Sequence, residues 1–130
     1  MYRALHTAIA DSRTASVRGI YRGGLAVHAA LAAMAGGLGL TLDLAKVPLD
    51  AALREDKLLF SESAGRFLIT VAPDCRQAFE TAMGEHVWGC VGVVTEAPRM
   101  VIKGAGGRLL VDLALEELKT AWKAPFGDLV

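Results

Sequence analysis

The sequence predicts one α+β domain, in which helices pack on a mixed β-sheet. Its 130 residues match the size of a single domain. The apolar pattern gives strand–helix–strand twice, then a hairpin and a helix, an order typical of mixed sheets. Hydrophobic residues make up 53% of the chain, against about 45–50% in soluble domains. Either a membrane segment or extensive burial must account for this excess.

The elements of the first third are read from periodicity and from glycines. Tyr2, Leu5 and Ile9 recur at the i, i+3, i+7 spacing of an amphipathic helix. Residues 15–20 predict a strand, which is followed by a turn at Gly23-Gly24.

The next predicted helix, residues 25–35, is apolar almost all round, so we expect neighbours on more than one of its sides. Gly36-Gly37 ends it in the manner of a C′ glycine. Alternation of leucines with smaller or polar residues over 38–42 then predicts a half-buried strand.

The middle of the chain predicts a short helix or turn over the charged residues 48–57 and a strand over 67–71. Pro73 and Asp74 open a further helix. Its expected apolar stripe consists of Cys75, Ala78, Phe79, Ala82 and Met83.

The last third predicts a strand over 91–95, then a hairpin of 100–103 and 109–111 around the glycine-rich turn 104–107. A phosphate-binding loop is the alternative interpretation of that turn. The final helix covers 115–122, with acidic residues first and lysines last, as the helix dipole favours. Its expected apolar face consists of Leu115, Leu118 and Trp122.

Residues 24–42 carry no charge and approach the length of a membrane span. Alanine and glycine contribute little to membrane insertion, so we interpret the stretch as buried and expect no membrane segment. We expect no secretory signal, because the first residues contain no long apolar stretch. Cys75 and Cys90 are expected to be buried free thiols of a cytoplasmic protein. Balanced charge, 14 basic against 14 acidic residues, argues against nucleic-acid binding.

No metal site is predicted, because the three histidines lack ligand spacing and no Cys-x-x-Cys or His-Glu-x-x-His motif occurs. We expect His28 to be a hydrogen-bonded core or interface residue. The strongest candidate site is the strand–turn–helix of Arg18, Arg22, Gly23 and Gly24. A helix N-terminus offers free N–H groups, glycines admit an anion, and arginines bind phosphate. The alternative is a structural turn with solvated arginines.

A second candidate is the small polar loop before the strand at 67–71, whose possible ligand groups belong to Ser61, Glu62, Ser63 and Arg66. The alternative is an ordinary turn in which Glu62 and Arg66 are solvated.

Six segments resemble the C-terminal lobe of the aminoimidazole ribonucleotide synthase superfamily, most of all the last such lobe of phosphoribosylformylglycinamidine synthases. They cover nearly the whole chain in the family's order: 2–6, 23–27, 35–39, 59–67, 92–95 and 115–122. The resemblance implies a ligase of purine synthesis that converts formylglycinamide ribonucleotide to its amidine. That enzyme uses ATP and Mg²⁺ to phosphorylate an amide oxygen, and ammonia from glutamine displaces the phosphate.

The resemblance also implies that residues 1–130 are one C-terminal lobe of a longer chain, inactive alone. Its partners would be the other lobes and a glutaminase domain or subunit. No capping residue precedes the first helix, which also favours a piece of a longer protein. Because the 25–35 helix lacks a polar face, we expect an apolar patch through which the isolated lobe self-associates.

One departure from the family concerns the glycine turn. The family commonly has Asp-x-Ser-Asp-Gly-Gly, and this chain has Gly19 and Arg22 in place of the two carboxylates. Mg²⁺ prefers carboxylate oxygens, so only anion-binding geometry is kept here. The turn binds substrate phosphate, a structural nucleotide or nothing, and the sequence leaves these three open.

The leading hypothesis is that the lobe helps to close a ligand cleft and to bind phosphate or nucleotide. One alternative is a catalytically inert packing domain. Another is the equivalent lobe of a selenophosphate synthetase, a thiamine-monophosphate kinase or a hydrogenase maturation factor.

Overall fold

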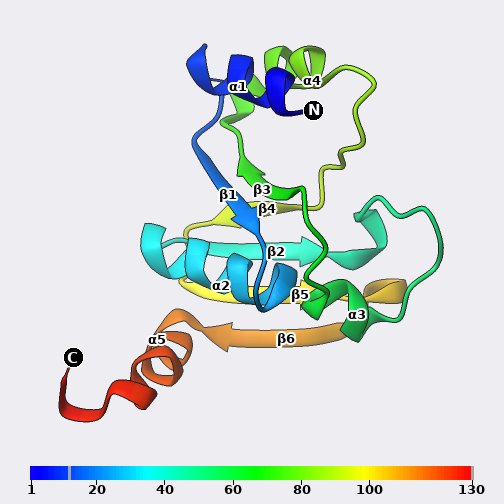
Figure 1. Ribbon diagram of the computed structural model, residues 1–130. Helices are drawn as coiled ribbons and strands as arrows, with labels where there is room; N and C mark the ends of the chain where they lie inside the picture. The colour runs from blue at the N-terminus through cyan, green and yellow to red at the C-terminus, as the bar shows by residue number, and fades with distance from the viewer. Residues whose placement is uncertain (12, 130) are drawn as a thin grey trace.

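The computed structural model describes residues 1–11 and 13–129, within which the chain forms five α-helices and six β-strands (Figure 1). The elements follow one another in the predicted order, which confirms the α+β prediction. The strands are β1 (Ser16–Ile20), β2 (Gly39–Asp43), β3 (Arg66–Thr70), β4 (Gly92–Thr95), β5 (Arg99–Lys103) and β6 (Leu109–Ala114). The helices are α1 (Tyr2–Ala10), α2 (Gly24–Gly36), α3 (Glu55–Phe60), α4 (Arg76–Met83) and α5 (Leu115–Lys123).

The strands of the described residues form two sheets. The main sheet has four strands in the order β4-β2-β5-β6, with β2 and β5 parallel and the other pairs antiparallel. β1 and β3 form a separate antiparallel pair, here called the β1–β3 ribbon. Each predicted strand–helix–strand unit is therefore divided between the sheets, because periodicity identifies a strand without identifying its partner.

Helix α2 lies at the centre of the main core. It packs against α3, α5 and β1, and its residues from Gly24 to Met34 are buried or half-buried. Met100 and Ile102 of β5 are buried in the same core, at 4% and 0% exposure. The expectation that this apolar helix is covered on more than one side is confirmed.

A smaller core lies between α1 and α4, which lie side by side at the far end of the β1–β3 ribbon (Figure 1). Ala8, Phe79 and Met83 are its buried residues. The predicted α1 face is wrong in part, because Tyr2 and Ile9 are 65% and 47% exposed. The helix turns the Leu5–Ala8 side inward instead.

Glycines and caps mark the ends of several elements, and the glycine end of α2 is as predicted. Gly37, with φ 65°, closes α2, and the Glu117 carboxylate accepts the Ala114 N–H at 2.7 Å before α5. Helix α3 begins only at Glu55, near the end of the charged stretch, and extends to Phe60 so that Leu58 and Leu59 are buried. The β5–β6 hairpin around residues 104–107 is confirmed.

Some exposed positions correct the sequence predictions. Both cysteines are free, but neither is buried as predicted. Cys75 is half-buried, and Cys90 is exposed because residues 84–90 lie outside both cores. Leu38 is 46% exposed and precedes β2; in the predicted α4 stripe, Ala78 is exposed. Trp122 of α5 is 53% exposed. No helix in the described part of the chain has the length and apolarity needed to span a membrane.

Candidate functional site

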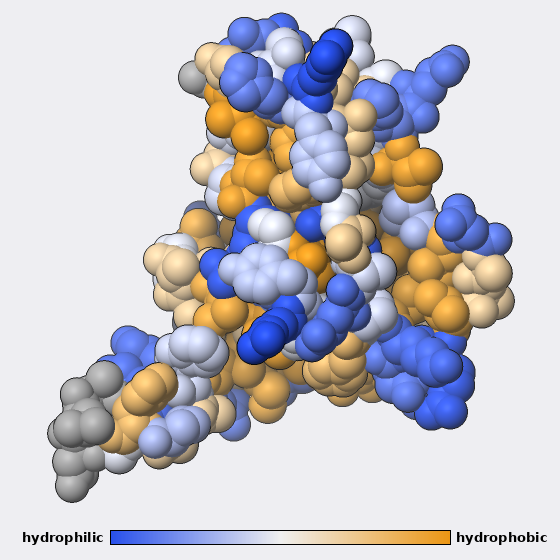
Figure 2. Space-filling view, in the orientation of Figure 1, coloured by the Kyte–Doolittle hydropathy of each residue, from blue (hydrophilic) through white to orange (hydrophobic). Residues whose placement is uncertain are grey.

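The two candidate segments of the sequence meet where α2 begins. The Gly23 N–H donates to Oε1 of Glu62 at 2.8 Å, across 39 residues of sequence. This contact joins the turn before α2 to the loop between α3 and β3. We call Arg18, Arg22, Gly23, Gly24 and Glu62 together the α2-start site. The start of α2 lies near the middle of the view in Figure 1. In the same orientation, Figure 2 shows hydrophilic surface there, with hydrophobic surface on either side.

Both glycines of the turn are required by the backbone. Their φ angles are 84° at Gly23 and 67° at Gly24, a region that disfavours other residues. A Cβ on Gly24 would lie 2.5 Å from the Leu59 carbonyl oxygen and 2.7 Å from the Phe60 Cα. The glycines therefore let the end of α3 approach the start of α2, whatever else the turn does.

The first turn of α2 contains backbone donors without an acceptor in the helix. No side chain caps it, and it contains no acidic residue. The Gly24 N–H donates to the Tyr21 carbonyl, but Leu25 and Ala26 have no acceptor within the helix. The positive end of the helix dipole acts at the same place. Glu62, from another segment, is therefore the anion that the fold supplies there.

The three arginines of the two segments have different surroundings. Arg18, half-buried on β1, donates from Nε to Nδ1 of His28 at 3.0 Å. Arg22 is exposed and makes no side-chain hydrogen bond or ion pair with the described residues. Arg66 donates to the carbonyls of Ser63, at 3.3 Å, and Ser61. Arg66 thus closes its own loop, whereas Arg22 and the terminal nitrogens of Arg18 remain for a ligand.

His28 is 2% exposed in the second turn of α2. Its ring lies 4.3 Å from that of Tyr21, between centroids, with a tilt of 60°. Nδ1 accepts from Arg18, and Nε2 has no hydrogen-bond partner among the described residues. The prediction of a hydrogen-bonded core histidine is confirmed. Its hydrogen bond with Arg18 was not predicted, although a lone histidine on an apolar helix indicates that a hydrogen-bond partner is needed.

The donor set of the α2-start site fits phosphate and does not fit Mg²⁺. Glu62 is the single carboxylate of the set and already accepts the Gly23 N–H, and Gly19 and Arg22 bring none. No cluster of three or more metal-ligating side chains occurs in the described part of the chain. Backbone N–H groups and guanidinium groups are donors that phosphate oxygens accept well. The arrangement is suited to holding an anionic group beside α2.

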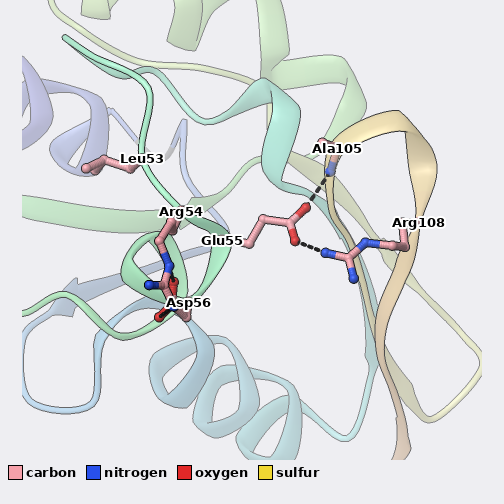
Figure 3. Close-up of a pocket in the computed structure, with 6 residues that line it drawn as sticks. All are labelled: Leu53, Arg54, Glu55, Asp56, Ala105 and Arg108. Atoms are coloured by element: carbon pink, nitrogen blue, oxygen red, sulfur yellow. Dashed lines mark hydrogen bonds and ion pairs between the residues drawn. The ribbon is translucent and has the colours of Figure 1, made fainter.

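The second glycine turn, residues 104–107, also receives a carboxylate. Glu55 accepts the Ala105 N–H at 2.7 Å and pairs with the Arg108 guanidinium (Figure 3). Both partners border an open hollow of about 540 Å³. An internal anion therefore occupies this turn, which fits the predicted structural role. Glu55 was not predicted as a contact residue, because it lies in a charged stretch that is typical of a solvated surface.

Comparisons with known proteins agree with this architecture. The family described as AIR synthase related protein, C-terminal domain, matches residues 6–105. Subunit PurL of phosphoribosylformylglycinamidine synthase from Moorella thermoacetica is 41% identical over 102 residues, covering 78% of this chain and 13% of the relative. The PurL of Lactobacillus helveticus is 33% identical over 119 residues, covering 92% of this chain and 15% of the relative. The chain thus spans a small part of these relatives.

Solved structures share the fold. T. maritima PurL complexed with ATP gives a TM-score of 0.79 at 20% identity, covering 89% of this chain and 20% of that one. HypE of E. coli gives a TM-score of 0.71 at 20% identity, covering 87% of this chain and 38% of that one. The family match spans most of the chain, and PurL relatives are more than 30% identical over more than two thirds of it. The chain therefore belongs to the AIR synthase related proteins, as a C-terminal domain of that family.

Proposed function

We propose that this chain is the C-terminal lobe of an ATP-dependent carbon–nitrogen ligase that converts formylglycinamide ribonucleotide to its amidine. Its curated relatives are phosphoribosylformylglycinamidine synthase subunits. Solved PurL structures of the same fold are described as complexes with ATP and with FGAR. Because the chain spans 13–15% of the relatives cited above, catalysis belongs to the whole enzyme, and the lobe alone is inactive.

The lobe's own task is to hold a phosphate group of the nucleotide or substrate at the α2-start site and to help close the cleft over it. The observation that carries this proposal is the contact of Glu62 with the Gly23 N–H. It indicates that the turn attracts an anion, while Arg22 and Arg18 lie within the same segment. The Gly23-Gly24 backbone would contact phosphate, and both arginines would add charge-assisted hydrogen bonds.

ATP bound in the whole enzyme would supply the phosphoryl group that makes the amide oxygen a leaving group. Ammonia then takes the place of that oxygen, which departs with the phosphate. The lobe contributes charge neutralisation by guanidinium groups, and no metal contact is proposed for it, since its turn lacks carboxylates. We propose the other lobes and a glutaminase as partners, in keeping with a T. maritima assembly described as PurLQS.

A phosphate titration of the chain, followed by NMR, tests this role. The Arg22→Glu variant should bind inorganic phosphate at least about fivefold more weakly, because it replaces a cation with an anion at the turn. Lys123→Glu, the same charge reversal on α5, should stay within about twofold of the unchanged chain. Equal affinity in the Arg22 variant and the unchanged chain would remove Arg22 from the site.

The competing function is an inert packing domain with a structural glycine turn. Glu62 favours it, because this carboxylate already satisfies the Gly23 N–H. The Glu62→Gln variant distinguishes the two functions. A chain that shows no saturable phosphate binding in either form is a packing domain, whereas binding that strengthens in the variant indicates a ligand site.

A further inference from the structure

We infer that His28 is a positioning residue, which holds the Arg18 guanidinium so that its terminal nitrogens meet phosphate at the α2-start site. This inference rests on the proposed phosphate binding and adds to it a residue from inside the helix. Its basis is the chain of contacts from Arg18 to His28 to Tyr21.

The contact with His28 uses one guanidinium nitrogen. Arg18 donates from Nε at 3.0 Å, and no other side-chain hydrogen bond or ion pair of Arg18 occurs within the described residues. The two terminal nitrogens keep four N–H donors in a planar fork. That fork matches two oxygens of a phosphate group. Holding Nε therefore fixes the plane of the group without using the donors that a phosphate needs.

His28 lies close to the start of α2. Gly24 is the first residue of the helix, and His28 lies about one turn later. Side chains of a helix lean toward its N-terminus. The imidazole therefore leans toward the first turn, in which the N–H groups of Leu25 and Ala26 have no acceptor within the helix.

The burial of His28 argues against a purely structural role. The ring is 2% exposed and lies against Tyr21. A neutral ring that accepts at Nδ1 carries its proton on Nε2, which has no partner among the described residues. A buried donor without a partner destabilises a fold, and buried neighbours such as Leu25 and Ala29 are apolar. Stability alone would favour an apolar side chain here.

Variants of residue 28 separate positioning from packing. His28→Leu should keep or raise the midpoint of urea unfolding and bind inorganic phosphate about fivefold more weakly, through a less ordered Arg18. His28→Gln, whose side-chain oxygen accepts a hydrogen bond, should restore binding to within about twofold. His86→Leu is the matched control, because His86 is exposed outside both cores, and it should change neither quantity.

Nitrogen NMR of Arg18 gives a readout that packing does not move. In the unchanged chain, Nε of Arg18 should show a coupling to Nδ1 of His28 across the hydrogen bond, and its signal should shift as phosphate saturates the chain. If His28→Leu does not fold, the coupling, the phosphate-dependent shift and the phosphate affinity of His28→Gln test the positioning role instead. An Nε signal with neither coupling nor shift overturns the inference.

The outcome also distinguishes this inference from the proposed function. If Arg18→Ala binds phosphate as the unchanged chain does, Arg18 has no place in the site, and both statements about it fail. If Arg18→Ala weakens binding but His28→Leu folds and binds normally, phosphate binding stands and the positioning role of His28 is overturned.

Discussion

The two glycine turns of this domain each receive a carboxylate from the segment around α3, but the surroundings of the two carboxylates differ. Glu55, at the start of α3, accepts the Ala105 N–H and pairs with Arg108, and its side chain is 22% exposed. Glu62, just after α3, is exposed and accepts from the Gly23 N–H alone among the described residues. One turn thus has a fixed internal anion, and the other has an anion held by one bond.

The difference concerns how firmly each carboxylate is held. A carboxylate with two partners, one of them a cation, is expensive to displace because both partners lose their bonds together. A carboxylate with one exposed bond competes with solvent and with other anions. The Gly23 turn also precedes a helix of 13 residues, whose dipole is positive at this end, and it follows Arg22 directly in sequence. Under the proposed function, an external phosphate should therefore compete for the Gly23 turn and not for the 104–107 turn.

The largest expected effect compares a glycine of each turn. Gly24→Ala should lower the free energy of unfolding by about 3 kcal/mol, since positive φ and overlap with the α3 backbone act together. Gly106→Ala should lower it by about 1 kcal/mol, because φ is 63° but no atom lies within 4 Å of the new Cβ. Urea unfolding followed by circular dichroism measures both. Similar losses of unfolding free energy would show that the close approach of α3 to Gly24 does not add to the cost of the substitution.

The two carboxylates should differ in their contribution to stability. Glu55→Ala removes two hydrogen bonds and leaves Arg108 unpaired, so the free energy of unfolding should fall by about 2 kcal/mol. Glu62→Ala removes one exposed bond and should lower it by about 0.5 kcal/mol. The same urea experiment compares them, and a larger loss for Glu62 would reverse the assignment of the fixed anion.

The smallest expected effect is on phosphate affinity. Glu62→Gln removes the competing charge, so binding of inorganic phosphate should strengthen about threefold, which corresponds to about 0.7 kcal/mol. Glu116→Gln removes an exposed carboxylate of α5 instead and should leave the dissociation constant unchanged within error. Weaker binding in the Glu62 variant would mean that Glu62 supports the ligand rather than competing with it.

The sequence was a good guide where the deciding interactions are local. Periodicity and glycines located α2 and its end at Gly37, because helix burial and a left-handed C′ residue leave short-range patterns. The α1 face was missed in part, since Ala8 contributes little to an apolar pattern yet is 0% exposed. The small side chain is what allows α4 to approach.

Long-range pairings could not be read from the sequence. The β1–β3 ribbon joins residues about fifty positions apart, and the sequence of neither strand identifies the strand with which it pairs. The Gly23–Glu62 and Arg18–His28 contacts likewise depend on the path of the chain between them. The sequence therefore indicated candidate residues in both segments, and the fold shows that Glu62 of the second segment contacts Gly23 of the first.

The most direct test of phosphate binding at the α2-start site is a titration of the unchanged chain with inorganic phosphate, observed at each backbone amide by NMR. The account predicts saturable shifts at the amides of Gly23 to Ala26, with one common dissociation constant. The amides of Ala105 to Gly107, where Glu55 already occupies the turn, should not move with that constant. Shifts of equal size at both turns, or no saturable shift at Gly23 and Gly24, would contradict the account.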